Sequence, residues 1–322
     1  MTNIAETKAK RAGFVAIVGR PNAGKSTLVN RLVGQKIAIV TSKPQTTRNR
    51  IQGIVTRDDG QVVLIDTPGL HGAKTVLNRQ MMKEVAAALE GIDALVLMVD
   101  AAETLANQGS GTQAHVDPML IERAKRFDGR TILALNKVDK AAKNKLLPLM
   151  EEFRKAHPFV AMVPISALKG DGCDELLAEA MKLLPQGEPY FPDDQVTDQP
   201  ERFLASEIVR EKAIALTYHE VPHALHVMVD KWEELPKLLR IQMTLTVERP
   251  SQKKILIGRK GDMLKQVGTQ ARKELEEILS TKIYLGLFVK VAENWRENPV
   301  AVRELDWHTQ LAALGEQKKD DE

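Results

Sequence analysis

Residues 19–26, GRPNAGKS, have the composition and spacing of a phosphate-binding loop. The segment matches G-x-x-x-x-G-K-[ST] and lies between an apolar run at 14–19 and a helical pattern at 26–34. In this setting backbone N–H groups surround phosphate oxygens at a helix N-terminus, Lys25 reaches the β- and γ-phosphates, and Ser26 binds Mg²⁺. Pro21 has no N–H to donate. The sequence therefore predicts a nucleotide site with these candidate contacts: Gly19, Arg20, Pro21, Asn22, Ala23, Gly24, Lys25, Ser26 and Thr27.

A second candidate group is DTPGL at 66–70, which follows the strand pattern QVVLID at 61–66. An acid at that strand end can hold Mg²⁺, and the N–H of Gly69 can donate to the γ-phosphate. Many GTPases place a water-orienting glutamine after this glycine. Leu70 has no polar side-chain atom, so another group must hold the attacking water. The candidate residues here are Asp66, Thr67, Pro68, Gly69 and Leu70.

The tetrapeptide NKVD at 136–139 follows the next-to-last strand pattern of this half. It is the segment predicted to select the base of the nucleotide. Asp139 can accept hydrogen bonds from N1–H and the 2-amino group of guanine, whereas adenine presents an acceptor at N1. We expect Asn136 to tie neighbouring loops together, Lys137 to lie along the base and the Ala167 N–H to meet guanine O6. GTP is therefore favoured over ATP. The predicted contacts are Asn136, Lys137, Val138, Asp139, Ser166, Ala167 and Leu168.

The Thr-rich segment TSKPQTTRNR at 41–50 lies where a phosphate-sensing loop is expected. Thr47 is the predicted second hydroxyl ligand of Mg²⁺, and Thr46 is the alternative. The predicted metal ligands are then Ser26, Thr47 and Asp66. The predicted catalytic residues are Lys25, Asn22, Thr47 and Gly69.

These motifs require an α/β domain with a mostly parallel sheet and helices on both faces. Apolar runs at 14–19, 61–66, 93–100, 131–137 and 159–166 alternate with helical patterns, and each motif falls at a carboxyl end of a strand. A polar, glycine-containing stretch at 105–118 predicts a mobile loop. Four prolines at 183–200 indicate a linker. After it, the order helix–strand–strand–helix–helix–strand predicts a smaller α+β domain.

The second half carries GRKG at 258–261 between two helical patterns. Two glycines let the backbone approach a phosphodiester, and adjacent basic side chains neutralise it. From 251 to 273 there are seven basic residues and one acidic residue. We expect this region to clamp about four unpaired RNA nucleotides. The candidate contacts are Lys253, Lys254, Gly258, Arg259, Lys260, Gly261, Lys265 and Arg272.

Composition sets outer limits on these interpretations. The chain has 322 residues, of which 43% are hydrophobic and 28% charged, with a net charge of +3. No apolar run approaches the roughly 18 residues that span a bilayer, and the polar N-terminus does not resemble a secretory signal. Cys173, the single cysteine, fits a reducing cytoplasm. His219, His223 and His226 have metal-like spacing, but Pro222 interrupts the helix that a metal site would need.

Taken together, GRPNAGKS, QTTR, DTPGL, NKVD and SAL, followed by IGRKG in an αββααβ domain, resemble the Era family. The resemblance implies a P-loop GTPase domain followed by a type II KH domain. We expect a flexible N-terminus at 1–12, a GTPase domain at 13–184, a linker at 185–200, a KH domain at 201–310 and a flexible tail at 311–322. Members of the family have an apolar residue where Leu70 lies, so Leu70 does not argue against hydrolysis.

The resemblance also implies ligands and partners. It implies GTP/GDP and Mg²⁺ as ligands, slow intrinsic turnover, and K⁺ held near the phosphates by Asn22. It implies binding to the 3′ end of small-subunit (16S) ribosomal RNA, a role in small-subunit assembly and loose association with the inner membrane. We expect the protein to be a monomer. Two alternatives stay open: an RNA-binding scaffold in which GTP is a structural ligand, and a P-loop ATPase, with which Asp139 conflicts.

Overall fold

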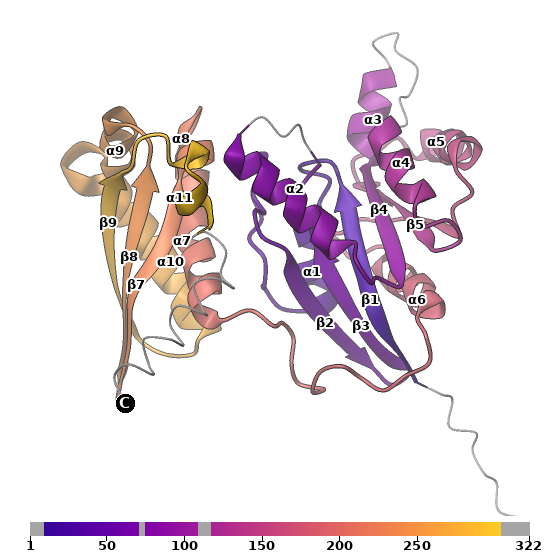
Figure 1. The fold of residues 1–322 in the computed structure, drawn as a ribbon, viewed down its shortest axis with the longest axis horizontal. Coiled ribbons are helices and arrows are strands. Elements are labelled where there is room, and N and C mark those ends of the chain that lie inside the picture. The colour runs from indigo at the N-terminus through magenta and orange to yellow at the C-terminus, as the bar shows by residue number, and fades with distance from the viewer. Residues whose placement is uncertain (1–9, 71–74, 109–116, 304–322) are drawn as a thin grey trace, which may run out of the picture. The chain divides into compact units, whose positions relative to one another are not determined.

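The chain forms two compact units, which Figure 1 shows as two groups of helices and strands. The computed structural model describes residues 10–70, 75–108 and 117–303. One unit contains Met1–Ala38, Thr47–His71 and Lys83–Asp198, and the other contains Ile39–Thr46, Gly72–Met82 and Gln199–Glu322. Two short segments from the first half of the chain thus belong to the second unit. The tail expected at 311–322 and most of the N-terminus expected at 1–12 lie outside the described residues.

The first unit is built on a six-stranded sheet with the order β2-β3-β1-β4-β5-β6. Its strands are β1 (Arg11–Gly19), β2 (Ile51–Arg57), β3 (Gly60–Asp66), β4 (Ala94–Asp100), β5 (Thr131–Asn136) and β6 (Ala161–Pro164). The central pairs are parallel, as predicted. β2 is a strand that the sequence reasoning did not predict, and it pairs antiparallel with β3. The Asp-Asp-Gly turn at 58–60 is the hairpin signal that marks it.

Helices cover both faces of this sheet. The helices of this unit are α1 (Lys25–Val33), α3 (Ala101–Gln108), α4 (Pro118–Lys125), α5 (Lys143–Ala156) and α6 (Cys173–Leu183), whereas α2 (Val76–Ala88) is divided between the units, with its residues up to Met82 in the second. α1 and α6 pack on alternate strand residues such as Val15, Ile17 and Val96. The opposite face contacts α3 and α4. α3 corrects the loop predicted at 105–118, because residues 105–108 are helical, whereas 109–116 lie outside the described residues.

The second unit has the predicted αββααβ order, so the small α+β domain is confirmed. Its elements are α7 (Glu201–Leu216), α8 (Val221–Ala224), β7 (His226–Leu235), β8 (Leu238–Val247), α9 (Pro250–Ile257), η1 (Arg259–Gly261), α10 (Asp262–Ile278), β9 (Ile283–Val291), η2 (Trp295–Glu297) and α11 (Pro299–Arg303). β8 pairs antiparallel with β7 and parallel with β9. The result is a three-stranded mixed sheet.

Alternation along β8 separates the core of this unit from its solvent-facing side. Leu239, Ile241, Met243, Leu245 and Val247 are buried in one cluster with residues of α7, α9 and α10. The residues between them are exposed or partly exposed. A strand with this period of two buries one face and leaves the other to water. Within the described ranges, no helix is long and apolar enough to cross a membrane.

Candidate functional site

The P-loop joins β1 to α1, and the DTPGL segment lies against it. Gly24 precedes α1 with φ 100°, and a Cβ there would lie 2.3 Å from Nδ2 of Asn136. Only glycine fits this conformation and this space. The Leu70 N–H donates to the carbonyl of Gly19 at 3.2 Å, and a Cβ on Gly69 would lie 2.8 Å from Cα of Pro21. The two predicted phosphate-binding segments are therefore in contact.

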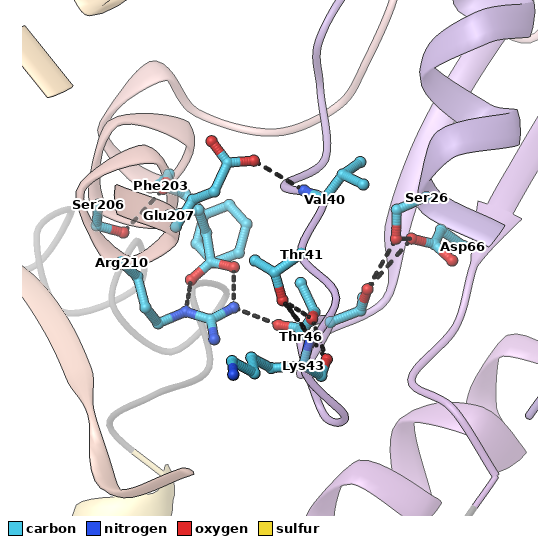
Figure 2. A network of polar contacts seen from close by, with 12 residues as sticks. Ser26, Val40, Thr41, Lys43, Thr46, Asp66, Phe203, Ser206, Glu207 and Arg210 are labelled. Atoms are coloured by element: carbon cyan, nitrogen blue, oxygen red, sulfur yellow. Dashed lines mark hydrogen bonds and ion pairs between the residues drawn. The ribbon is translucent and has the colours of Figure 1, made fainter. Parts of the chain in front are cut away.

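The three predicted metal ligands meet beside the P-loop, and Figure 2 shows Ser26 and Asp66 pointing toward one another. The Ser26 hydroxyl donates to Oδ2 of Asp66 at 2.6 Å and lies 2.9 Å from Oγ1 of Thr47. Thr47 Oγ1 lies 3.5 Å from the same carboxylate oxygen. Thr46, the alternative ligand, instead bonds to Thr41 Oγ1 at 2.6 Å and to the Lys43 carbonyl at 2.7 Å. The geometry favours Thr47.

These oxygens fit the chemistry of Mg²⁺, which takes hard oxygen ligands. Asp66 is fully buried, and its Oδ1 has no hydrogen-bond partner among the described residues. A buried carboxylate oxygen without a partner is costly unless a ligand satisfies it. Ser26, Thr47 and Asp66 thus form a donor set suited to a divalent cation.

Burial also shifts the pKa values of the two charged groups of this site. Lys25 is 6% exposed, and its Nζ donates to the carbonyls of Gly19 at 3.2 Å and Arg20 at 3.1 Å. Desolvation lowers the pKa of Lys25, an effect that the Asp66 carboxylate opposes. Desolvation raises the pKa of Asp66, against the opposing effects of Lys25 and of the Ser26 and Thr47 hydroxyls. Each group would gain from a ligand that brings the opposite charge.

Asn136 ties loops together, as its position predicts. Its Nδ2 donates to the Ala23 carbonyl at 2.7 Å, and its Oδ1 accepts from the Ala167 N–H at 2.9 Å. The second contact differs from the expectation that the Ala167 N–H meets guanine O6, because that N–H is already engaged by Asn136. The Ser166 hydroxyl donates to Oδ1 of Asp139 at 2.8 Å and so orients the predicted base-selecting carboxylate.

The Lys137 side chain contacts the P-loop and forms an ion pair with Asp100, a residue that the sequence analysis does not single out. Its Nζ donates to the Asn22 carbonyl at 2.7 Å and lies 2.6 Å from Oδ2 of Asp100. Asp100 ends β4, between the strands that carry the P-loop and NKVD. A polar residue at that strand end was the available signal, since neighbouring parallel strands bring such residues to one edge.

The predicted RNA contacts all belong to the second unit. Gly258 has φ 77° and Gly261 has φ 86°, and Lys260 between them also has a positive φ, 53°. Most of the basic side chains on this turn and its flanking helices are exposed: Lys254, Arg259, Lys260, Lys265 and Arg272. Lys253 is partly buried on α9. The turn presents its charges to solvent between the ends of two helices.

Comparison with known proteins agrees with both halves of this description. A family model described as a 50S ribosome-binding GTPase matches residues 14–137, and a KH domain model matches 220–296. GTPase Era of Syntrophus aciditrophicus (strain SB) is 46% identical over 301 residues, covering 92% of this chain and 95% of that protein. GTPase Era of Geotalea uraniireducens (strain Rf4) is 45% identical over 298 residues, covering 92% and 98%.

Solved structures give the same result. A variant of Aquifex aeolicus Era bound to GDP and AlF4⁻ is 40% identical with a TM-score of 0.86, covering 92% of this chain and 99% of that one. Era in complex with MgGDPNP and nucleotides 1506–1542 of 16S ribosomal RNA is 41% identical, with the same TM-score and coverage. Identity at this level over nearly the whole chain, with both units matched, shows the family. The chain belongs to the Era family and is a GTPase with a KH domain.

Proposed function

We propose that this GTPase is a molecular switch that binds the 3′ end of small-subunit ribosomal RNA and assists assembly of the small ribosomal subunit. Residues 13–184 would form the GTPase domain, 185–200 the linker and 201–310 the RNA-binding domain. The observation that carries the proposal is that one chain holds a P-loop site with buried Lys25 and Asp66 and a G-R-K-G turn with exposed basic side chains. The relative solved with MgGDPNP and a 16S ribosomal RNA fragment supports the same pairing of ligands.

The residues of the P-loop would bind and orient GTP. Backbone N–H groups of the loop and the N-terminus of α1 favour the phosphates, and the Lys25 ammonium lies at the start of that helix. Gly69 packs closely on Pro21 of the P-loop, and its backbone N–H would donate to the γ-phosphate. Asp139, oriented by Ser166, would accept from guanine N1–H and the 2-amino group. These groups fix the phosphates and the base at opposite ends of the nucleotide.

Ser26, Thr47 and Asp66 would hold Mg²⁺, which neutralises negative charge on the β- and γ-phosphate oxygens when it is bound. The role of the protein is to keep these three oxygens together, and their mutual hydrogen bonds already do so. Because burial raises the pKa of Asp66, its carboxylate is easier to protonate than an exposed one. Cation affinity is therefore expected to fall as the solution is acidified.

Asn22 is our candidate for the group that replaces an arginine finger. Its side-chain oxygen would hold K⁺ near the phosphates and so add positive charge where negative charge develops. Hydrolysis is then faster in K⁺ than in Na⁺, and the gain disappears in Asn22→Ala and Asn22→Gly. The glycine variant matters because Asn22 has φ 62°, which glycine adopts without strain. Equal rates in the two salts would exclude the cation.

The RNA-binding role is tested by reversing the charge of the turn. Arg259→Asp with Lys260→Asp is expected to abolish binding of a labelled single-stranded RNA matching the rRNA 3′ end, while basal GTP hydrolysis stays nearly unchanged. Lys143→Asp with Lys145→Asp, on exposed positions of α5, makes the same charge change elsewhere and should preserve RNA binding. Full RNA binding by the Arg259 and Lys260 double variant would remove the proposal.

The family resemblance extends the proposal to a cytoplasmic monomer that associates loosely with the inner membrane. Sedimentation equilibrium tests the monomer. Flotation with vesicles of inner-membrane lipid tests the association, which should be weak and lost at high salt if charge carries it. A protein that stays at the bottom of the gradient at low salt would exclude direct lipid binding.

A further inference from the structure

Asp100 joins two elements of the first unit next to the nucleotide site. It ends β4, where the parallel register pairs it with Asn136 of β5, and it directly precedes α3. Its Oδ1 accepts from the Glu103 N–H at 3.1 Å, as an N-cap residue does, and its backbone carbonyl accepts from the Thr104 hydroxyl at 2.7 Å. The capping bond orients the carboxylate, so that its other oxygen, Oδ2, points to a different partner.

That partner is the ammonium group of Lys137. Its Nζ lies 2.6 Å from Oδ2 of Asp100, and the side chains of the lysine and the aspartate are 29% and 11% exposed. The same Nζ donates to the Asn22 carbonyl at 2.7 Å. Lys137 is therefore a bridge between a carboxylate that caps α3 and the backbone of the P-loop.

The backbone at Asn22 is a place where the P-loop needs support. Asn22 has φ 62°, in the left-handed region, which a residue with a Cβ adopts at a cost and keeps only where its surroundings determine it. Because a peptide unit is planar, a bond to the Asn22 carbonyl also holds the N–H of Ala23. Asn136 holds the next carbonyl, that of Ala23, at 2.7 Å. Two successive carbonyls of the loop are thus bonded to side chains of NKVD.

A second aspartate is arranged in the same way at the start of α4. Asp117 is the N-cap of that helix, and its Oδ1 accepts from the Met119 N–H at 2.9 Å. Its Oδ2 accepts from Nε of Arg20 in the P-loop at 2.7 Å. The Arg20 side chain is 66% exposed, so water screens this pair more than the pair of Lys137. Each aspartate therefore uses one oxygen for its helix and the other for a cation that binds the P-loop or belongs to it.

We propose that Asp100 is a positioning residue for the P-loop, acting through Lys137 on the backbone of Asn22, and that Asp117 is a weaker second support through Arg20. All of these groups belong to the first unit. The expected effect on nucleotide affinity follows from these contacts. The expected effect on potassium rests in addition on the proposed function of the Asn22 side chain, which shares its Cα with the held carbonyl.

The test replaces one oxygen of Asp100. Asp100→Asn keeps an oxygen that can cap α3, but it removes the charge and presents an amide donor to the ammonium group of Lys137. Asp100→Ser also keeps a capping oxygen, without the reach to the lysine, and gives a second variant. Asp93→Asn is the matched control, because this partly buried aspartate precedes the other end of β4 and accepts from the Phe14 N–H at 2.8 Å. Thermal unfolding of the full chain confirms that each variant folds.

Nucleotide affinity gives the first readout. Asp100→Asn and Asp100→Ser should each weaken binding of a labelled non-hydrolysable GTP analogue about tenfold at saturating Mg²⁺, because a hydrogen bond from a charged group to the P-loop is no longer held in place. Asp93→Asn should leave the affinity unchanged. Asp117→Asn should weaken it by less than about fivefold, as expected for an exposed pair.

A double-variant comparison shows whether Asp100 acts through the lysine. In a Lys137→Met background, Asp100→Asn should weaken binding by less than about a further twofold, since residues that share one contact are not additive. A merely structural loss would be equal in the parent and Lys137→Met backgrounds, and it would overturn the proposal.

The potassium requirement gives the second readout. Asp100→Asn should raise the K⁺ concentration that gives half-maximal stimulation of GTP hydrolysis about fivefold, because a displaced Asn22 backbone also displaces its side-chain oxygen. Asp93→Asn should leave this concentration unchanged. A K⁺ response that Asn22→Ala abolishes but Asp100→Asn leaves unaltered would overturn the effect on the Asn22 side chain.

The outcomes separate this inference from the proposed function. If Asn22→Ala does not alter the response to K⁺, the potassium role of Asn22 is wrong, and the affinities together with the double-variant comparison still decide the role of Asp100. If Asp100→Asn and Asp100→Ser bind the GTP analogue as tightly as the parent, Asp100 does not position the P-loop, whatever the response to K⁺.

Discussion

The P-loop and the G-R-K-G turn both place glycines where backbone must approach phosphate, but their surroundings are opposite. In the P-loop, Lys25 is 6% exposed and bonded to loop carbonyls, and Gly24 has Asn136 directly against it. In the turn, Arg259 and Lys260 are exposed, and a Cβ on Gly261 would meet nothing within 4 Å among the described residues. The charged side chain of the P-loop is thus buried, whereas those of the turn face solvent; the packing differs at Gly261 but not at Gly258, where a Cβ would lie 2.6 Å from Cβ of Met263.

The difference follows from the ligands. A nucleotide is small, so most of its phosphate oxygens can be surrounded by fixed donors in a site of low dielectric, where each contact is strong. A single-stranded RNA is extended, so its phosphates must be met by exposed charges that release counterions. The enclosed loop is expected to be intolerant of small changes in shape, and the open turn to be sensitive mainly to charge and salt.

The largest effect is expected from adding one methyl group to each loop. Gly24→Ala should weaken GTP binding by at least about 100-fold, because a left-handed alanine is strained by 1–2 kcal/mol and its Cβ would also displace Asn136. Gly261→Ala carries similar strain but no clash, so its RNA affinity should fall by no more than about 30-fold, the equivalent of that strain. Titrations with labelled nucleotide and labelled RNA measure both. Comparable losses in the two variants would contradict the contrast.

A change of base specificity tests the enclosed site at its other end. Asp139→Asn should weaken GTP binding by about 100-fold, since hydrogen bonds to a charged group contribute up to about 3 kcal/mol. Xanthosine triphosphate should bind better than in the parent, because the new amide can donate to its C2 carbonyl. Competition binding gives both values. A variant that keeps the preference of the parent for GTP would show that another group reads the base.

The dependence of affinity on salt concentration should also differ between the two sites. If the turn neutralises about four phosphates of a single strand, RNA affinity falls roughly 50-fold between 50 mM and 200 mM salt. GTP affinity should change much less at constant free Mg²⁺, because the buried pair of Lys25 and Asp66 is poorly screened. RNA affinity that is insensitive to salt would mean that the exposed charges do not carry binding.

The smallest effect on chemistry is expected at Leu70, which is 7% exposed beside the P-loop. Leu70→Ala should hydrolyse GTP within about tenfold of the parent, roughly 1.4 kcal/mol in barrier, because leucine cannot orient water. Truncating a buried leucine lowers the free energy of unfolding by about 2 kcal/mol or more, so rates are compared well below the melting temperature. A collapse of turnover with GTP binding intact would give Leu70 a direct role.

Much of the fold and of the nucleotide site was predictable because the signals are local. The P-loop, DTPGL and NKVD follow strands whose apolar runs mark a buried parallel sheet, and the structure places them at the ends of β1, β3 and β5. The spacing of apolar residues in the second half likewise predicts its αββααβ order. β2 was missed because an edge strand with mixed residues lacks that apolar run, although its hairpin turn was visible.

The sequence alone determined which chemical groups this protein has, and tertiary structure decided which of them meet. Spacing could not choose between Thr46 and Thr47, since adjacent residues have the same side chain and differ only in where the backbone points them. Nor could it show that Asn136 engages the Ala167 N–H, or that Lys137 holds a carbonyl 115 positions earlier. Contacts between distant segments depend on how elements pack, which no local pattern encodes.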